Sequence, residues 1–141
     1  MSMAMTEQER ESFLADLHIG VLGITRPSGA PSLTPIWYRY ADGVVEVVTP
    51  GSSAKVALLQ QAGRASFCVQ REGEPAPAYV TVEGRVSIAP APDGLVEAIA
   101  SRYLGAEAGA AFAAGPGQQD DTVVALHVDK WRTLDFSKMG G

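Results

Sequence analysis

The chain has 141 residues, of which 46% are hydrophobic and 19% are charged, and its formal net charge is −5. This composition is typical of a folded globular protein, and we take residues 1–141 as a single domain. The acidic balance argues against nucleic acid as a partner, because a phosphate backbone requires a basic protein surface.

The chain contains one cysteine, Cys68, which lies in an apolar run. No disulfide can form within such a chain, and a free buried thiol suits a reducing cytoplasm. The first 13 residues lack the apolar region of a signal peptide, and no apolar run approaches the ~20 residues that cross a bilayer. We therefore expect a cytoplasmic protein without a membrane span.

The first half of the chain predicts a helix, a three-stranded meander and a second helix. Thr6 and Glu9 form a capping-box pattern, so the first helix is expected from about Glu7 to Asp16. Strands are expected next, at 18–26, 31–40 and 44–49, with hairpin turns between them. The second helix is expected over 53–62, with Gly63 just after its end.

The second half alternates in the same way. Strands are expected at 64–71 and 78–88, and Gly84 inside the second of them marks a bulge or a bend. Two helices, a loop expected to be mobile and two final strands follow, at 93–105, 106–115, 115–121, 122–128 and 131–136. About seven short strands joined by hairpins favour a mainly β fold, an antiparallel barrel with flanking helices.

Common catalytic and metal-binding motifs are missing from the sequence. His18 and His127 are the only histidines, and neither stands at a metal-ligand spacing from Cys68 or from a pair of carboxylates. We expect His18 to cap a helix end, His127 to be structural, and no metal to be bound. The Gly-Lys pair of a nucleotide P-loop and the Gly-x-Ser-x-Gly elbow are also absent.

The segment that begins the second helix has the features of an anion site. Ser52 or Ser53 can cap the helix, and the helix dipole favours a negative charge near the remaining N–H groups. Lys55 in the first turn is unfavourable by a few tenths of a kcal/mol unless an anion lies nearby. Two interpretations remain open, a capped helix with a solvated lysine and a phosphate site formed by Ser53, the backbone and Lys55.

Three aromatic residues, Trp37, Tyr38 and Tyr40, lie close together on the predicted strand 31–40. They fit the core and rim of a barrel, and they also fit a flat apolar wall for a ring system. Thr49 is expected across the hairpin, just before the anion site. A ring on the strand and its phosphate at the turn match the requirements of flavin mononucleotide (FMN) or a related cofactor.

Two segments carry a resemblance to a known family, "GVVEVVTPGSSAKVALLQQAGRASFCVQ" (43–70) and "YVTVEGRVSI" (79–88). They resemble the FMN-binding split barrels related to pyridoxamine 5′-phosphate oxidase, and within them the flavin/deazaflavin oxidoreductases that use coenzyme F-420 or FMN. The shared order is a strand that ends in Thr, a Ser-x-Lys helix start, a strand, and a strand with Glu-Gly-Arg-Val. The resemblance covers about residues 10–135.

The resemblance implies a six- to seven-stranded antiparallel split barrel of Greek-key type, and a homodimer with cofactors at the subunit interface. The cofactor-binding residues that it implies are Pro35, Ile36, Trp37, Thr49, Ser53, Lys55, Tyr79, Trp131 and Arg132. The first three would line the ring, the next three would contact the phosphate, and Tyr79 would approach the ring. The last two would reach a cofactor held by the other subunit.

The sequence also departs from the family pattern. Ala54 stands where the FMN oxidases have an arginine directly before the lysine, and Ala57 stands where deazaflavin relatives often have a basic residue. Arg39 lies only at the end of its strand, where the oxidases carry a basic residue within it. These differences imply weaker binding of the phosphate. A larger cofactor with further contacts elsewhere, such as F-420, is therefore at least as compatible with the sequence as FMN.

We therefore expect an oxidoreductase in which F-420 or FMN transfers hydride to a small unsaturated or aromatic substrate. No side chain is expected to act as an acid or base, so no catalytic residue is assigned. One alternative is a non-catalytic protein that binds or sequesters a flavin, a deazaflavin or haem. Another is a structural barrel whose aromatic residues only form the core.

Overall fold

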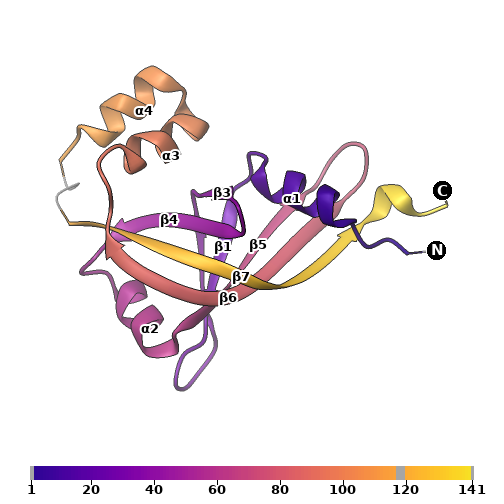
Figure 1. Ribbon diagram of the computed structural model, residues 1–141, viewed down its shortest axis with the longest axis horizontal. Coiled ribbons are helices and arrows are strands. Elements are labelled where there is room, and N and C mark those ends of the chain that lie inside the picture. Colours follow the sequence, from indigo (N-terminus) through magenta and orange to yellow (C-terminus); the bar gives the residue numbers. More distant parts are fainter. Residues whose placement is uncertain (1, 117–119, 141) are drawn as a thin grey trace.

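The computed structural model describes residues 2–116 and 120–140, and its main element is a seven-stranded antiparallel sheet (Figure 1). The strands are β1 (Gly20–Ile24), β2 (Ser32–Ile36), β3 (Arg39–Ala41), β4 (Val44–Pro50), β5 (Arg64–Arg71), β6 (Ala78–Pro90) and β7 (Asp121–Asp135). The helices are α1 (Glu7–Ala15), α2 (Ala54–Ala62), α3 (Leu95–Leu104) and α4 (Ala106–Ala113), followed by a 3-10 turn, η1 (Phe136–Lys138). The prediction of a mainly β antiparallel barrel with flanking helices is confirmed. The loop that was expected to be mobile includes residues 117–119, which lie outside the described residues.

The strand order places two consecutive strands at opposite edges of the sheet. That order is β2-β1-β5-β6-β7-β4-β3, so the chain leaves β2 at one edge and enters β3 at the other. The predicted single strand over 31–40 is therefore wrong, because Trp37 and Tyr38 lie between two strands that pair with different partners. Tyr38 is fully buried, and its hydroxyl donates a 2.6 Å hydrogen bond to the carbonyl of Leu14. The chain has to leave the ladder to place this ring inside the barrel.

The long strands β6 and β7 run side by side along the molecule (Figure 1). Residues 121–135 form one continuous strand, so the two short final strands that the sequence predicts are wrong. The predicted irregularity at Gly84 is confirmed: Glu83 pairs with Lys130 and Gly84 with Val128, which leaves Asp129 as the extra residue of a bulge. A Cβ atom at Gly84 would lie 1.8 Å from the carbonyl oxygen of His127, so only glycine fits there.

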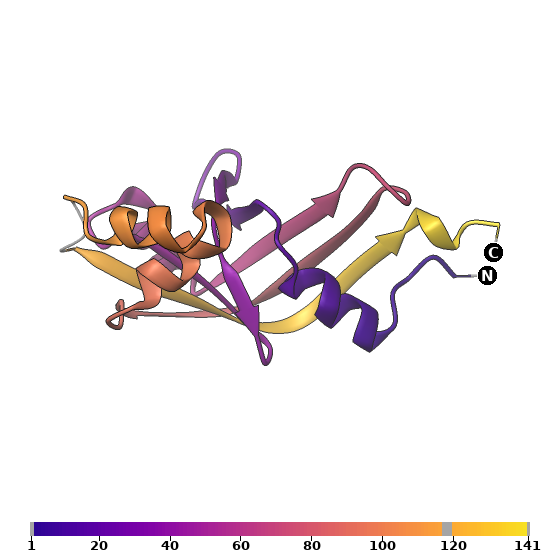
Figure 2. The ribbon, with the colours of Figure 1, turned by 90° about the horizontal axis from the view of Figure 1, so that it is seen from above.

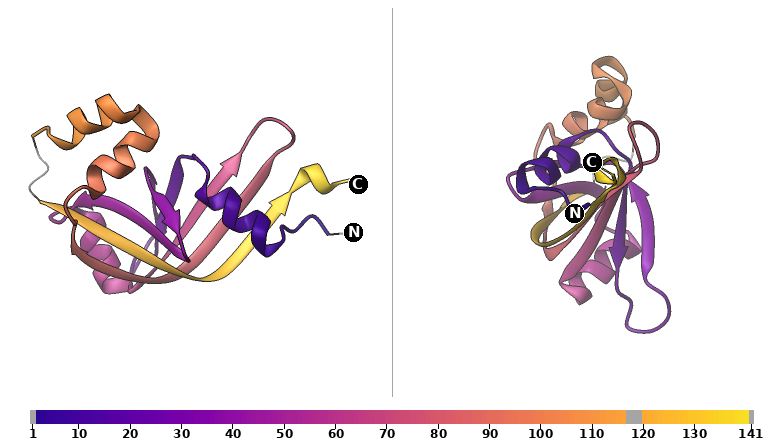
Figure 3. Two further views of the ribbon diagram at one scale, coloured as in Figure 1. Left: turned by 45° about the horizontal axis from the view of Figure 1, so that its top comes forward. Right: turned by 90° about the vertical axis from the view of Figure 1, so that its right-hand side faces the viewer.

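The helices lie outside the sheet, and each begins and ends within two residues of the predicted bounds. Thr6 and Glu9 form the predicted capping box, and Gly63 ends α2 with a φ of 72°. Helices α3 and α4 form a hairpin that lies over one end of the sheet in the view from above (Figure 2) and on the outside of the barrel in Figure 3. The hairpin is tightly closed, because a Cβ atom at Gly109 would lie 2.7 Å from the Cα of Ser101.

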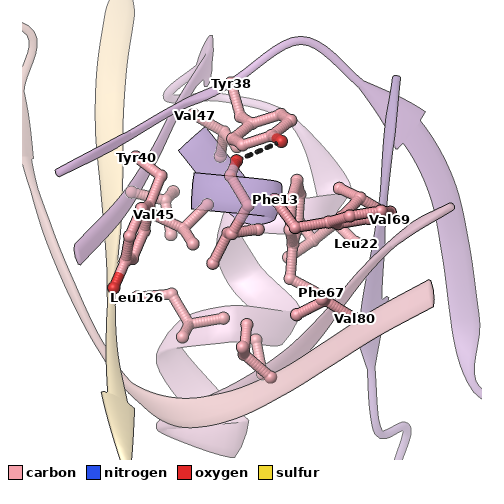
Figure 4. Close-up of a cluster of buried hydrophobic side chains, with 14 of the residues drawn as sticks. Phe13, Leu22, Tyr38, Tyr40, Val45, Val47, Phe67, Val69, Val80 and Leu126 are labelled. Atoms are coloured by element: carbon pink, nitrogen blue, oxygen red, sulfur yellow. Dashed lines mark hydrogen bonds between the residues drawn. The ribbon is translucent and has the colours of Figure 1, made fainter. Parts of the chain in front are cut away.

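The core fills the barrel with aliphatic side chains around two aromatic rings, Tyr38 and Phe67, whose centroids are 4.8 Å apart (Figure 4). Tyr40 is also buried, and its hydroxyl donates a 2.6 Å hydrogen bond to Glu11. Two of the three aromatic residues on the segment 31–40 are therefore core residues. Only Trp37 remains available for a binding surface.

The two histidines have the structural roles that the sequence suggests. His18 lies just after α1, and its Nε2 donates a 2.8 Å hydrogen bond to the carbonyl of Phe13 near the end of that helix. The Nε2 of His127 lies 3.0 Å from the hydroxyl of Ser87 on the neighbouring strand. Among residues 2–116 and 120–140, no three His, Cys, Asp or Glu side chains lie close enough together to hold a metal ion. No helix in this part of the chain is long and apolar enough to span a membrane.

Candidate functional site

A cleft of about 510 Å³ lies between the crossover from β2 to β3, the end of β4 and the helical hairpin α3–α4. Its lining residues are Pro35, Ile36, Trp37, Val48, Thr49, Pro50, Val96, Ile99, Ala100, Phe112 and Asp121. Most of this lining is apolar, and the polar side chains Thr49 and Asp121 come from the paired ends of β4 and β7. A cleft of this size and character suits an organic ring system with one polar end.

Four of the nine predicted cofactor-binding residues meet in this cleft. Pro35, Ile36 and Trp37 come from the end of β2 and the crossover, and Thr49 comes from β4. The expected hairpin pairing between their strands is wrong, because β2 pairs with β1 and β4 pairs with β3 and β7. The crossover brings these segments together instead, since it carries the chain from one edge of the sheet to the other.

The predicted phosphate site lies beside the polar end of the cleft. Thr49 is only 5% exposed, and its Oγ1 lies 3.5 Å from the Oγ of Ser53 at the start of α2. Ser53 is the N-cap residue of α2, as the sequence predicts, but its hydroxyl makes no capping hydrogen bond. Lys55 lies in the first turn of α2, half-buried, and does not line the cleft. Thr49 therefore lines the cleft and contacts Ser53, whereas Lys55 is not among the residues of the cleft.

Two carboxylates that the sequence analysis missed lie at the same end. The carboxylate of Asp120 accepts a 2.9 Å hydrogen bond from the N–H of Ser52, and its carbonyl accepts one of 2.8 Å from Gly51. Asp121 lines the cleft opposite Pro50, and burial, followed by the charge of Asp120, raises the pKa of its carboxyl group. Nothing in the sequence pattern places these residues next to the turn before α2. Both carboxylates make the binding of a further negative charge, such as an anionic ligand, less favourable at this end of the cleft.

The helical hairpin supplies the wall that sequence reasoning did not assign. Trp37 stacks on Tyr103, with ring centroids 5.0 Å apart and an interplanar angle of 9°, and tilts against Phe112 at 5.5 Å. A signal for this wall exists in the sequence, because four residues of α3 follow the i, i+3, i+4, i+7 spacing of one helix face. These residues are Val96, Ile99 and Ala100, which line the cleft, and Tyr103, which stacks on Trp37.

The other three predicted residues lie elsewhere on the chain. Tyr79, Trp131 and Arg132 line a separate hollow of about 610 Å³ on β6 and β7, which shares no lining residue with the cleft. Trp131 is held in place on its other side, with the guanidinium carbon of Arg10 4.5 Å from its ring centroid and the edge of Tyr40 at 6.1 Å. One chain therefore does not bring these residues to the cleft, and their contact with a cofactor of a second subunit stays a prediction.

An antiparallel sheet whose two edges are linked by a crossover, with a cleft beside that crossover, defines a split-barrel protein. The sequence profile of the pyridoxamine 5′-phosphate oxidase family matches residues 6–135. The chain therefore belongs to this family, as the sequence segments around Lys55 and Gly84 indicated.

Solved structures share the fold at low sequence identity. A conserved hypothetical protein from Mycobacterium tuberculosis is 23% identical, with a TM-score of 0.81 over 99% of this chain and 91% of the other. A structure described as an F420 reductase is 21% identical, with a TM-score of 0.73 over 86% and 94%. A FAD-binding protein from Mesorhizobium loti is 19% identical, with a TM-score of 0.71 over 92% and 94%. No curated protein sequence matched the chain.

Proposed function

We propose that this protein is an oxidoreductase that binds coenzyme F-420 or FMN in the cleft and acts on a small unsaturated or aromatic substrate. The observation that carries the proposal is the meeting of Pro35, Ile36, Trp37 and Thr49 in one cleft of about 510 Å³. Family membership and the names of two structural neighbours, an F420 reductase and a FAD-binding protein, support the class of cofactor.

The residues of the cleft fit such a cofactor in two ways. The apolar side chains of Ile36, Trp37 and Ile99 suit the faces of a planar ring. The hydroxyl groups of Thr49 and Ser53, and the ammonium group of Lys55 in the first turn of α2, suit a phosphate oxygen. The carboxylates of Asp120 and Asp121 reduce this fit for a doubly charged phosphate. They favour a ligand with less charge at this end, such as a phosphodiester.

The chain's own contribution is to bind, orient and exclude water. Trp37 and the hairpin α3–α4 cover the ring on the apolar side of the cleft, and Thr49 and Ser53 hold the polar end. When bound, the cofactor supplies the hydride-transfer chemistry. Among the described residues that line the cleft, Asp121 is the only one with a titratable side chain, and it lies at the Thr49 end. We therefore assign no catalytic acid or base.

A homodimer is part of the proposal. The cleft is open in the single chain, and a partner surface would close it. In a dimer, Tyr79, Trp131 and Arg132 would contact the cofactor held by the other subunit, as the family resemblance implies. Light scattering coupled to gel filtration tests this part directly, since a mass near 14.8 kDa rather than twice that value would contradict it.

The experiment that tests the function begins with cofactor binding. The purified protein is titrated with FMN by absorbance and with F-420 by fluorescence quenching, and Trp37→Ala serves as the variant of the ring wall. We expect micromolar binding of at least one cofactor and clear weakening by Trp37→Ala. The absence of binding for both cofactors would overturn the proposal. Turnover is then measured with the reduced cofactor and a panel of unsaturated and aromatic acceptors.

The alternative is a protein that binds a flavin, a deazaflavin or haem without turnover. Two observations favour it: Ala54 replaces the arginine of the FMN oxidases, and Asp120 occupies an N–H group of the same turn. Both features weaken the hold on a phosphate. Tight binding of any of these ligands without turnover of any acceptor would support this alternative over the enzyme.

A further inference from the structure

The crossover that forms the ring wall of the cleft receives its hydrogen bonds from helix α3. Tyr38 lies between β2 and β3, so its backbone groups are outside the ladders of both strands. Its N–H donates a 3.1 Å hydrogen bond to the hydroxyl of Tyr103, and its carbonyl accepts one from the guanidinium of Arg102. Backbone groups at a buried residue require such partners, and here two neighbouring side chains of α3 provide them.

The same two side chains tie α3 to the end of α1. The hydroxyl of Tyr103 donates a 2.7 Å hydrogen bond to the carbonyl of His18. The guanidinium of Arg102 donates to the carbonyls of Ala15 and Asp16, at 2.9 and 3.1 Å. These carbonyls belong to the C-terminal end of α1, where a cation is favourable. The helical hairpin, α1 and the crossover therefore meet at one point of the molecule.

Tyr103 has a second contact that reaches the cleft. Its ring stacks against the indole of Trp37 with an interplanar angle of 9°. Trp37 is the residue directly before Tyr38 in the chain. A tyrosine hydroxyl is protonated at neutral pH, and burial raises the pKa of Tyr103 further, so the hydroxyl keeps both hydrogen bonds. Tyr103 does not itself line the cleft. It acts behind the wall that Trp37 presents.

We infer that Tyr103 is a positioning residue of the cleft, which fixes the orientation of the Trp37 indole and thereby the affinity for a planar ring. The hydroxyl sets the path of the crossover, and the ring sets the plane of the indole. The part of this inference that concerns affinity rests on the proposed function, and the part that concerns Trp37 does not. The two parts can therefore be tested separately.

The test labels both tryptophans with 5-fluorotryptophan and records fluorine NMR spectra, in which Trp131→Phe assigns the two signals. Tyr103→Phe removes the hydroxyl and keeps the stacked ring, and Tyr103→Leu removes both. We expect the Trp37 signal to shift or broaden in Tyr103→Phe, and more so in Tyr103→Leu, while the Trp131 signal stays in place. Affinity for whichever of FMN and F-420 binds the unsubstituted protein should fall about three- to tenfold in Tyr103→Phe.

Tyr40→Phe is the matched control, because it also removes the hydrogen-bonded hydroxyl of a largely buried tyrosine, on the Trp131 side of the barrel. It should leave the Trp37 signal unchanged at a similar loss of thermal stability. An unchanged Trp37 signal in both Tyr103 variants would overturn the inference. A Trp37 shift of the same size in Tyr40→Phe would also overturn it, because that result would mean that loss of either buried hydroxyl loosens the whole fold. If neither cofactor binds the unsubstituted protein, the proposed function fails while the NMR spectra still decide the role of Tyr103.

Discussion

The carboxylate of Asp120 accepts a 2.9 Å hydrogen bond from the backbone N–H of Ser52, in the turn that precedes α2. The contact is closely packed, because a Cβ atom at Gly51 would lie 3.0 Å from the Oδ1 of Asp120. An acidic side chain thus uses a donor that a phosphate would otherwise use. It also adds a negative charge beside Ser53 and Lys55.

Asp120→Asn should therefore strengthen cofactor binding. The amide oxygen keeps an acceptor for the N–H of Ser52 and removes the charge, and we expect affinity for FMN to rise about two- to fivefold at low salt. Titrations at low and high ionic strength measure this effect, which salt should diminish. Asp42→Asn, at an exposed turn, is the control for net charge. Equal affinity of the Asp120 variant and the unsubstituted protein at low salt would contradict the prediction.

Cofactor affinity should also depend on pH through Asp121. Burial raises the pKa of this carboxyl group, so a fall in pH from neutral neutralises it before an ordinary aspartate. Loss of its negative charge at the polar end of the cleft should tighten the binding of an anion as the pH falls. The phosphate of the cofactor also titrates. Because Asp121→Asn lacks the carboxyl group, the pH profile of this variant measures the contribution of the phosphate alone. The prediction is wrong if the variant and the unsubstituted protein show parallel pH profiles.

The same shift has a consequence for stability, with a defined sign. Because the pKa of Asp121 is higher in the folded than in the unfolded chain, folding favours its neutral form. Its contribution to stability is present below the unfolded pKa and is lost as the pH rises through the folded pKa. Urea unfolding of Asp121→Asn should therefore show a larger gain in stability at pH 7 than at pH 4. A larger gain in stability at pH 4 than at pH 7 would contradict the expected direction of the pH dependence.

Lys55→Ala should weaken cofactor binding by about 1–3 kcal/mol, the usual range for a charge-assisted hydrogen bond. Lys55 lies in the first turn of α2, two positions after Ser53, where only a nearby anion makes a lysine favourable. Isothermal titration measures the change. Lys138→Ala is the matched control, because this lysine lies in η1 close to the C-terminus, which is at the opposite end of the molecule from α2 (Figure 1), and forms an ion pair with Glu9. Affinity within error of the unsubstituted protein would exclude the phosphate role of Lys55.

Gly84→Ala should destabilise the fold by about 2–4 kcal/mol, in the range of severe packing changes. Its Cβ atom would lie 1.8 Å from the carbonyl oxygen of His127, and backbone rather than a flexible side chain would have to move. Urea denaturation measures the free energy of unfolding. Gly73→Ala is the control, since no atom lies within 4 Å of the position of its added Cβ. Equal stability of the two variants would show that the bulge has no need for glycine.

Local sequence features were sufficient for most of the secondary structure. The capping box at Thr6 and the glycine at Gly63 fix helix ends through contacts within a few residues, so they are visible in the sequence. Gly84 within an otherwise regular strand indicated the bulge, in which Asp129 is the extra residue of the neighbouring strand. The alternation on 31–40 did not reveal two strands. Periodicity reports which side chains are buried, and it carries no information on the partner of a strand.

The sequence by itself determined the fold class and the family, and it singled out four residues that meet in the cleft, Pro35, Ile36, Trp37 and Thr49. Thr49, Ser53 and Lys55 follow one another within seven positions, so their nearness is a property of the chain. Only the tertiary structure decided that the crossover brings Trp37 to Thr49, that Tyr103 stacks behind it, and that Asp120 and Asp121 face the phosphate turn. These contacts join segments tens of residues apart, and strand pairing across the whole sheet sets them, which no local pattern encodes.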